Sequence, residues 1–362
     1  MNTEADVLID LDRLCANALS LKGAVGDFYC VLKCDAYGHG ATECAKALYE
    51  VGMTHFAVYS LRQAIQIEAV APASDILILG RTDFRYADTV IKHGFSQTVF
   101  SKEYLCELKP VSKGLKIHIK IDSGMNRSGF KCPISELENS LVGFSGEIFG
   151  VYTHFHCADA LSDLITVSQL EKFKTSAKEL EQMLRKKLIK HSAASAAALR
   201  FPQARMDISR IGLALYGVYP NNCDRICKLL PVMSFRAPIV AIGKVKKGEN
   251  IGYGCDNYAK RDMYTATVSV GYAGGLHRCA HRMLKPAVNG YRVPFAATVC
   301  MDRCILDVTD LIDNGISVRP YDTVEFFGDS VPISQSAADI GTIPYELMTQ
   351  IGALNPRTVI KT

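Results

Sequence analysis

Four polar residues in the first 210 positions stand at or near the ends of short apolar runs, where an enzyme could use them. Lys33 ends FYCVLK, His154 ends EIFGVYTH, Arg210 lies within RMDISRIGLALYG, and Ser195 lies in the small-residue loop HSAASAAA. Burial at a strand end lowers the pKa of a lysine amine and makes it a nucleophile, although a surface lysine is an equal alternative on position alone. The backbone N–H groups around Ser195 could bind a phosphate.

A second chemistry is suggested by His154 and His156, which are two residues apart in THFHCAD. Two such histidines at the end of a barrel strand can bind zinc in a hydrolase. No convincing set of further histidine and carboxylate ligands follows at later strand ends, so we predict no metal. A hydrogen-bonded core histidine is the other alternative for His154.

The elements that must position these residues alternate along the first two-thirds of the chain. Helical patterns cover 40–52 and 60–70, among strands predicted at 28–33, 55–60, 75–80, 97–100, 116–122, 147–154, 187–193 and 205–217. Eight strands separated by helices predict a (β/α)8 barrel over residues 1–232, whose reactive residues lie at the carboxyl ends of the strands. An open doubly wound sheet is the competing fold, but no GxGxxG follows a strand, which disfavours its dinucleotide-binding form.

The pattern changes near residue 233. Short β-rich runs are broken by Gly and Asn turns, with little helix until about residue 333 and a last helix around 342–351. We therefore predict a second, mostly β domain over 233–362.

Composition limits the classes of partner. Lys plus Arg exceeds Asp plus Glu by only 41 − 37 = 4, which gives no reason to expect nucleic acid or a membrane surface. The N-terminal residues lack an apolar signal segment and no run of about 18 apolar residues occurs, so a cytoplasmic protein is expected, although the chain could be part of a longer one.

The 13 cysteines form no disulfide framework. Three pairs four residues apart fit one face of a helix, or a coincidence, better than a zinc knuckle: Cys30/Cys34, Cys223/Cys227 and Cys300/Cys304.

One segment resembles a known signature. VLKCDAYGHG (31–40) resembles the pyridoxal-phosphate (PLP) lysine motif of alanine racemases. Further blocks resemble that family in its order: HIKIDSGMNRSGF (118–130), GVYTHFHCADA (150–160), ISRIGLALYGVYP (208–220), IGYG (251–254), VGYAGG (270–275), VCMD (299–302) and TIPYE (342–346). The resemblance implies a PLP-binding barrel followed by a β domain, with residues 1–10 paired to that domain. It also implies a homodimer that interconverts L- and D-alanine for cell-wall precursors.

The resemblance assigns two bases. Lys33 would hold PLP and exchange the α-proton on one face of the substrate. Tyr253 would be the base on the opposite face, reaching the barrel of the partner subunit, with His154 and Arg210 stabilising its phenolate. Arg210 would also lie beside the pyridine nitrogen, to which a guanidinium cannot give a full proton, so that reprotonation is favoured over transamination.

The remaining roles also follow from the resemblance. Arg127 would lie by the cofactor's phenolic oxygen and the substrate carboxylate, and Lys120 is either carbamylated to hold that arginine or an ordinary strand lysine. The phosphate would be bound by Tyr37, Ser195 and the backbone of Gly212 and Leu213. Met301 would meet the substrate carboxylate from the second subunit, beside Asp302, and Tyr272 would help close the entrance.

Two positions depart from the family pattern. Gly274 replaces the acid of the usual GYADG, and Ala353 stands where ungapped counting from TIPYE places a tyrosine that touches the phosphate and walls the substrate pocket. The extra space could admit serine, as in the serine-racemising branch associated with vancomycin resistance. Alanine remains the default substrate and serine the rival.

A non-catalytic alternative comes from a related single-barrel family that binds PLP and only handles the cofactor. That family lacks the β domain, and with it any counterpart of Tyr253 and Met301, so residues 233–362 disfavour this alternative.

Overall fold

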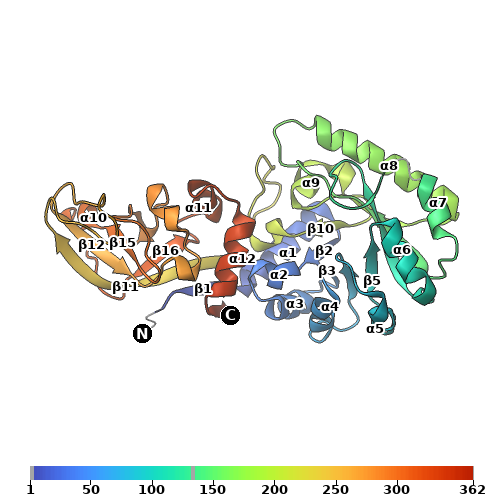
Figure 1. Ribbon diagram of the computed structural model, residues 1–362, viewed down its shortest axis with the longest axis horizontal. Helices are drawn as coiled ribbons and strands as arrows, with labels where there is room; N and C mark the ends of the chain where they lie inside the picture. The colour runs from blue at the N-terminus through green and yellow to red at the C-terminus, as the bar shows by residue number, and fades with distance from the viewer. Residues whose placement is uncertain (1–3, 132–134, 362) are drawn as a thin grey trace. The chain divides into compact units, whose positions relative to one another are not determined.

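The computed structural model describes residues 4–131 and 135–361. These residues form two compact units (Figure 1). One unit consists of Leu14–Ala36 and Ala41–Leu230; the other consists of Tyr37–Gly40 together with the described residues of Met1–Arg13 and Pro231–Thr362.

The first unit is built on eight parallel strands that form a nearly closed barrel. Their order around the barrel is β10 (Ser209–Ile211), β2 (Phe28–Val31), β3 (His55–Val58), β4 (Asp75–Ile78), β5 (Ser96–Val99), β6 (Lys116–Asp122), β8 (Glu147–Tyr152) and β9 (Ile189–His191). The last gap is bridged just beyond β9, where the N–H of Arg210 donates to Ala193 O at 2.9 Å. The predicted (β/α)8 barrel is thereby confirmed.

Helices follow the barrel strands along the chain, as Figure 1 shows. They are α1 (Leu11–Val25), α2 (Lys33–Tyr37), α3 (Ala41–Glu50), α4 (Leu61–Glu68), α5 (Ala87–Lys92), α6 (Lys102–Leu108), α7 (Ser135–Leu141), α8 (Leu164–Leu184) and α9 (Ser195–Arg200); a short strand β7 (Phe130–Lys131) follows β6. In α4, Ser60 and Gln63 form a capping box that satisfies backbone N–H groups at the helix start. In α8, residues three or four apart are buried, among them Leu170, Phe173, Ala177 and Leu180.

The strands are shorter than the apolar runs predicted them to be. β2 ends at Val31, so Lys33 lies beyond it and begins α2, and β8 ends at Tyr152, two residues before His154. Of the run 205–217 only Ser209–Ile211 is strand. Apolar composition alone therefore placed these strand ends wrongly, because the chain turns into a loop while its side chains are still buried.

The second unit is mostly sheet, as predicted. Its main order is β14 (Tyr291–Arg292), β13 (Ala287–Val288), β16 (Thr323–Phe327), β11 (Met233–Val245), β1 (Asp6–Asp10) and β17 (Arg357–Ile360); β12 (Met263–Val268) pairs with both β11 and β15 (Cys304–Asp307). β1 runs antiparallel to β11 and parallel to β17.

Three helices belong to this unit: α10 (Thr309–Asp313), α11 (Ile333–Asp339) and α12 (Pro344–Leu354). The expected last helix is confirmed as α12. The expectation of little helix before 333 is also confirmed, because the described residues between 233 and 332 contain only α10 and the 3-10 turns Tyr272–Gly274 and Arg278–Arg282.

The cysteine pairs do not share helix faces as the spacing suggested. Cys30 lies in β2 and Cys304 in β15, and every cysteine in the described part of the chain is a free thiol. Within residues 4–131 and 135–361, no helix combines the length and apolar character needed to cross a membrane.

Candidate active site

Lys33 opens a turn with an unusual backbone. The next three residues, Cys34, Asp35 and Ala36, have φ of 53–54° and ψ of 47–49°, which is the left-handed region that costs about 1–2 kcal/mol per residue with a Cβ. The turn is held by the side chain of Asp35, which accepts the N–H of Ala41 at 2.8 Å. Because the turn follows β2, Lys33 lies at the carboxyl end of a barrel strand, where the reactive residues of barrel enzymes are found.

The amine of Lys33 is largely removed from water. Burial lowers its pKa; the Cys34 thiol opposes this effect, whereas the positive charges of Arg127 and Arg210 add to it. A lysine in this state has a larger neutral fraction at neutral pH than a surface lysine. Lys33 can therefore act as a nucleophile or accept a proton.

Arg210, on β10, is buried and surrounded by neutral acceptors. One terminal nitrogen donates to Nδ1 and to the carbonyl of His191, both at 2.8 Å, and the other donates to Thr153 O at 2.7 Å. Its guanidinium lies over the Tyr152 ring, 4.8 Å from the centroid. Burial lowers its pKa only to about 10, so it stays a cation at neutral pH.

His154 is oriented by the same guanidinium. Its Nδ1 lies 3.5 Å from Arg210, which can only donate, so Nδ1 accepts and the ring carries its proton on Nε2. Burial, followed by the charges of Arg210, Arg127, Lys120 and Lys33, holds its pKa well below the ordinary value. His154 is therefore a neutral donor at Nε2.

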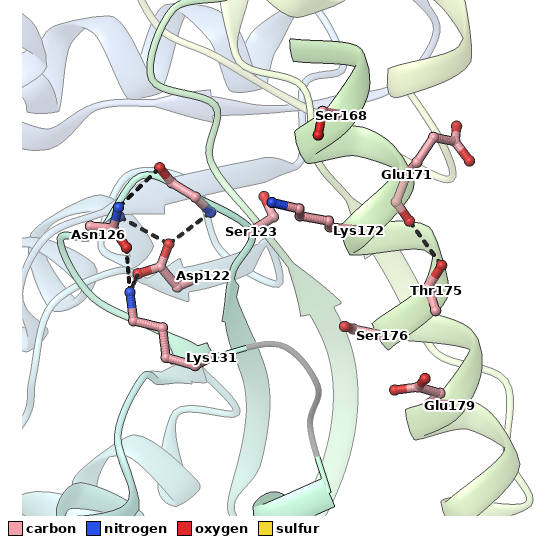
Figure 2. Close-up of a pocket in the computed structure, with 11 residues that line it drawn as sticks. Asp122, Ser123, Asn126, Lys131, Ser168, Glu171, Lys172, Thr175, Ser176 and Glu179 are labelled. Atoms are coloured by element: carbon pink, nitrogen blue, oxygen red, sulfur yellow. Dashed lines mark hydrogen bonds and ion pairs between the residues drawn. The ribbon is translucent and has the colours of Figure 1, made fainter. Parts of the chain in front are cut away.

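Arg127 is presented by a loop that Asp122 organises. Asp122 Oδ1 accepts the N–H groups of Gly124 and Asn126, both at 3.0 Å, and Oδ2 lies 3.1 Å from Lys131 Nζ. Figure 2 shows these interactions on one side of a pocket of about 730 Å³, with α8 on the other. Sequence analysis did not single out Asp122, although its place before Ser-Gly in IDSG is typical of a turn-forming acid.

Lys120 precedes this loop on β6. Its Nζ donates to Ser128 Oγ at 2.6 Å. Burial, together with Arg127 and Arg210, lowers its pKa to about 8. The charges of Arg127 and Arg210 thus act on both Lys33 and Lys120.

Ser195, Gly212 and Leu213 come together as expected. The Ser195 hydroxyl oxygen accepts the N–H of Gly212 at 3.1 Å and of Ala214 at 3.2 Å. These bonds join the start of α9 to the turn after β10 and leave the hydroxyl hydrogen to serve as a donor.

The second unit carries the other predicted residues, and several are exposed. The exposed fractions are 73% for Tyr253, 55% for Met301 and 41% for Tyr272. Tyr272 N donates to Cys300 O at 3.0 Å and Ala273 N to Met301 O at 2.9 Å, so Tyr272 and Met301 lie on paired backbone segments. A Cβ on Gly271 would lie 2.5 Å from the Met301 carbonyl carbon, which explains the glycine before Tyr272.

The segments that carry the two departures from the family pattern meet at Asn355, two residues after Ala353. Asn355 Nδ2 donates to Gly274 O at 2.9 Å, while Ala353 lies exposed on α12. A Cβ on Gly352 would lie 2.7 Å from the Gly38 Cα, so α12 packs backbone to backbone against the turn that contains Tyr37. The Tyr37 ring also meets Tyr345 of α12, with centroids 5.8 Å apart.

Two further residues were missed because their roles depend on barrel closure. His118 and His191 lie on β6 and β9 and are fully buried behind Arg210. The described part of the chain holds no group of three or more His, Cys, Asp or Glu side chains arranged for a metal ion.

Comparison with known proteins agrees with the fold. The family models described as "Alanine racemase, N-terminal domain" and "Alanine racemase, C-terminal domain" match residues 9–220 and 232–359. The chain is 34% identical to alanine racemase 1 of Clostridium acetobutylicum, over 98% of this chain and 94% of that protein, and 34% identical to alanine racemase 1 of Oceanobacillus iheyensis, over 98% and 97%.

Solved structures show the same likeness. Alanine racemase of Clostridium difficile 630 is 30% identical with a TM-score of 0.88, covering 99% of this chain and 96% of that one. The Bacillus anthracis alanine racemase with bound L-Ala-P has the same identity and TM-score, covering 100% and 96%. The chain belongs to the alanine racemase family.

Proposed function

We propose that this chain is a PLP-dependent isomerase that interconverts L- and D-alanine, with Lys33 as the residue that holds PLP. The observation that carries the proposal is the desolvated amine of Lys33 beside Arg127 and Arg210 at the carboxyl ends of the barrel strands. This arrangement combines a nucleophilic amine with fixed cations suited to the anionic groups of a cofactor and an amino acid.

The donor set fits PLP. Its phosphate would be held by Tyr37, the hydroxyl of Ser195 and the backbone N–H groups of Gly212 and Leu213. Arg210 would donate to the pyridine nitrogen and Arg127 to the phenolic oxygen. When bound, PLP supplies an electron-withdrawing ring that stabilises negative charge at the substrate α-carbon.

Two proton-transfer groups are needed, one for each face of the α-carbon. Lys33 serves one face, since burial lowers the pKa of its amine and so favours the neutral form that can accept a proton. We assign Tyr253 to the other face, with the neutral His154 donating from Nε2 to its phenolate oxygen and with Arg210 holding His154 in that tautomer.

The partner we propose is a second copy of this chain. The domain over 233–362, which carries Tyr253, Met301 and Tyr272, would then complete the active site in the barrel of the partner subunit. The exposure of these three side chains supports this proposal, because a group that acts in another subunit must be exposed in its own.

Alanine is the proposed substrate. The relatives and structures described above carry alanine in their names, whereas the reason to consider serine is the single position Ala353. The side-chain amide nitrogen of Asn355 donates to Gly274 O. This donor is therefore engaged and is not free to recognise a serine hydroxyl.

The test combines cofactor and activity. Borohydride reduction with PLP should fix the cofactor on the peptide that contains Lys33, and a Lys33→Ala control should not be labelled there. Chiral chromatography after incubation with L-Ala or L-Ser should show D-alanine formed faster. Labelling of another lysine, or no D-enantiomer from either substrate, would overturn the proposal.

A further inference from the structure

A pair of buried imidazoles stands behind Arg210. His118 Nδ1 lies 2.8 Å from His191 Nε2, and His191 Nδ1 lies 2.8 Å from a terminal nitrogen of Arg210. His118 and His191 are fully buried and Arg210 almost so. The three side chains form an unbroken hydrogen-bonded row from β6 through β9 to β10.

Geometry fixes the protonation of both rings. A guanidinium only donates, so His191 Nδ1 must accept and His191 must carry its hydrogen on Nε2. That N–H faces His118 Nδ1, which must also accept, so His118 carries its hydrogen on Nε2. A proton added to His118 Nδ1 would face the Nε2–H of His191, and a proton added to His191 Nδ1 would face an N–H of Arg210, so both rings are neutral.

Electrostatics supports this assignment. Burial, together with the charge of Arg210, holds the pKa of His118 at about 3 and that of His191 well below its ordinary value. Both rings therefore stay neutral over the range in which an enzyme works.

Neighbouring residues hold the two rings in place. The His191 ring stacks on Tyr152, with centroids 4.7 Å apart and planes 11° apart. On the other side of the row, Gly150 lacks the Cβ that would lie 2.6 Å from the His118 Cε1. Any larger residue at 150 would displace the His118 ring.

We propose that His118 is a positioning residue for Arg210. Its Nδ1 holds His191 in the Nε2–H tautomer, which presents a lone pair to the guanidinium. Arg210 favours the same tautomer from the other side of the ring, but without the His118 acceptor the Nε2–H of His191 would be buried with no partner. His191 could then move its hydrogen to Nδ1, where it would face the N–H of Arg210 and displace the guanidinium. The proposal rests on the proposed function, because Arg210 is the residue assigned there to the pyridine nitrogen.

The row also explains how a buried cation is held without an acid. Every acceptor described above for Arg210 is a carbonyl oxygen or an imidazole nitrogen, so its positive charge is not cancelled by a carboxylate. The two aligned imidazoles stabilise the guanidinium through their dipoles and leave its full charge directed at the site.

Two variants separate this role from packing. His118→Asn keeps an acceptor oxygen close to the position of Nδ1, whereas His118→Leu fills a similar volume without one. In protein labelled with ¹⁵N-histidine, the wild type and His118→Asn should show His191 as the Nε2–H tautomer. His118→Leu should show the Nδ1–H tautomer or a mixture.

Kinetics gives a second readout. His118→Leu should lower kcat for alanine by roughly tenfold, the effect of losing about one hydrogen bond, with KM changed less, and His118→Asn should largely restore it. Gly150→Ala should resemble His118→Leu, because it displaces the same ring without altering it.

The tautomer measurement needs neither PLP nor activity, so it is independent of the proposed function. An Nδ1–H tautomer of His191 in the wild-type protein would overturn the inference even if no variant folds. Equal kcat in the Leu and Asn variants would overturn it as well. Failure of wild-type protein to bind PLP or form D-alanine would instead overturn the proposed function and leave the tautomer result standing.

Discussion

Replacing Cys34 by glycine should stabilise the protein, although it removes a side chain from an ordered turn. Cys34 has φ 54° and an exposed side chain, so its Cβ contributes strain and little packing. The left-handed conformation costs about 1–2 kcal/mol for a residue with a Cβ. Glycine removes that cost but loses about 0.5–1 kcal/mol more backbone entropy on folding. The expected net gain is therefore about 0–1.5 kcal/mol, centred on about 0.75 kcal/mol.

The matched control is Cys34→Ser, which removes the thiol but keeps the Cβ and hence the strain. Thermal unfolding should show Cys34→Gly melting about 1–3 °C above Cys34→Ser, measured with and without added PLP so that ligand stabilisation is separated. A looser turn should also hold Lys33 less firmly, so kcat of the glycine variant should fall. A Cys34→Gly protein no more stable than Cys34→Ser would refute the view that this turn stores strain.

Four further outcomes test the site. Asp122→Ala should raise KM for alanine, because the Arg127 loop loses a charged acceptor for two N–H groups, and each of these hydrogen bonds is worth about 1.5–3 kcal/mol. Asp122→Asn keeps an acceptor, so its KM should stay near that of the wild type. Equal KM values for the two variants would contradict this prediction. Tyr253→Phe should lower turnover by about 10²–10⁴-fold with PLP still bound, and wild-type racemisation would exclude it as a base. In protein incubated with ¹³C-bicarbonate, a ¹³C carbamate signal from Lys120 should grow as the pH rises through about 8, because the amine becomes neutral there. The signal should be missing in Lys120→Arg. If the wild-type protein gives no signal at any pH, Lys120 is an ordinary lysine. Ala353→Tyr should depress racemisation of serine more than of alanine, by about 1–3 kcal/mol in discrimination, and equal effects would remove Ala353 as a reason to consider serine.

The barrel could be predicted because its signal is local and repeated. Buried parallel strands are apolar over most of their length, and β2, β3 and β4 show this pattern after at most one polar first residue. Strand ends were less accurate, because residues such as Leu32 and Thr153 remain buried after the ladder has ended. Local patterns report burial more directly than backbone conformation.

The left-handed turn could not be predicted from residue types. Cys34 and Ala36 have no preference for positive φ, and only the glycines that follow, Gly38 and Gly40, indicate an unusual backbone. The turn persists because contacts outside it, such as the bond from Ala41 N to Asp35, stabilise the conformation. The His118–His191 contact was equally hidden, since it joins residues 73 positions apart that only barrel closure brings together.

The electrostatics of the barrel site links these features to ligand binding. Lys33, Lys120 and Arg210 each have a pKa lowered by burial, and the positive charges of Arg127 and Arg210 further lower the pKa values of Lys33 and Lys120. Asp122, two residues beyond Lys120, directs its carboxylate to loop N–H groups and to Lys131. Gathering cations in this way opposes folding, because each buried charge must be desolvated.

An anionic ligand reverses that balance. The phosphate of the cofactor and the carboxylate of the substrate would supply the negative charge that the site lacks, in a region of low dielectric where each contact is strengthened. Binding of the proposed anionic cofactor would therefore offset the desolvation cost of burying Lys33 and Arg210. The charges that lower the pKa of Lys33 also favour its action as a base, so the proposed cofactor binding and proton transfer would depend on a single arrangement of charges.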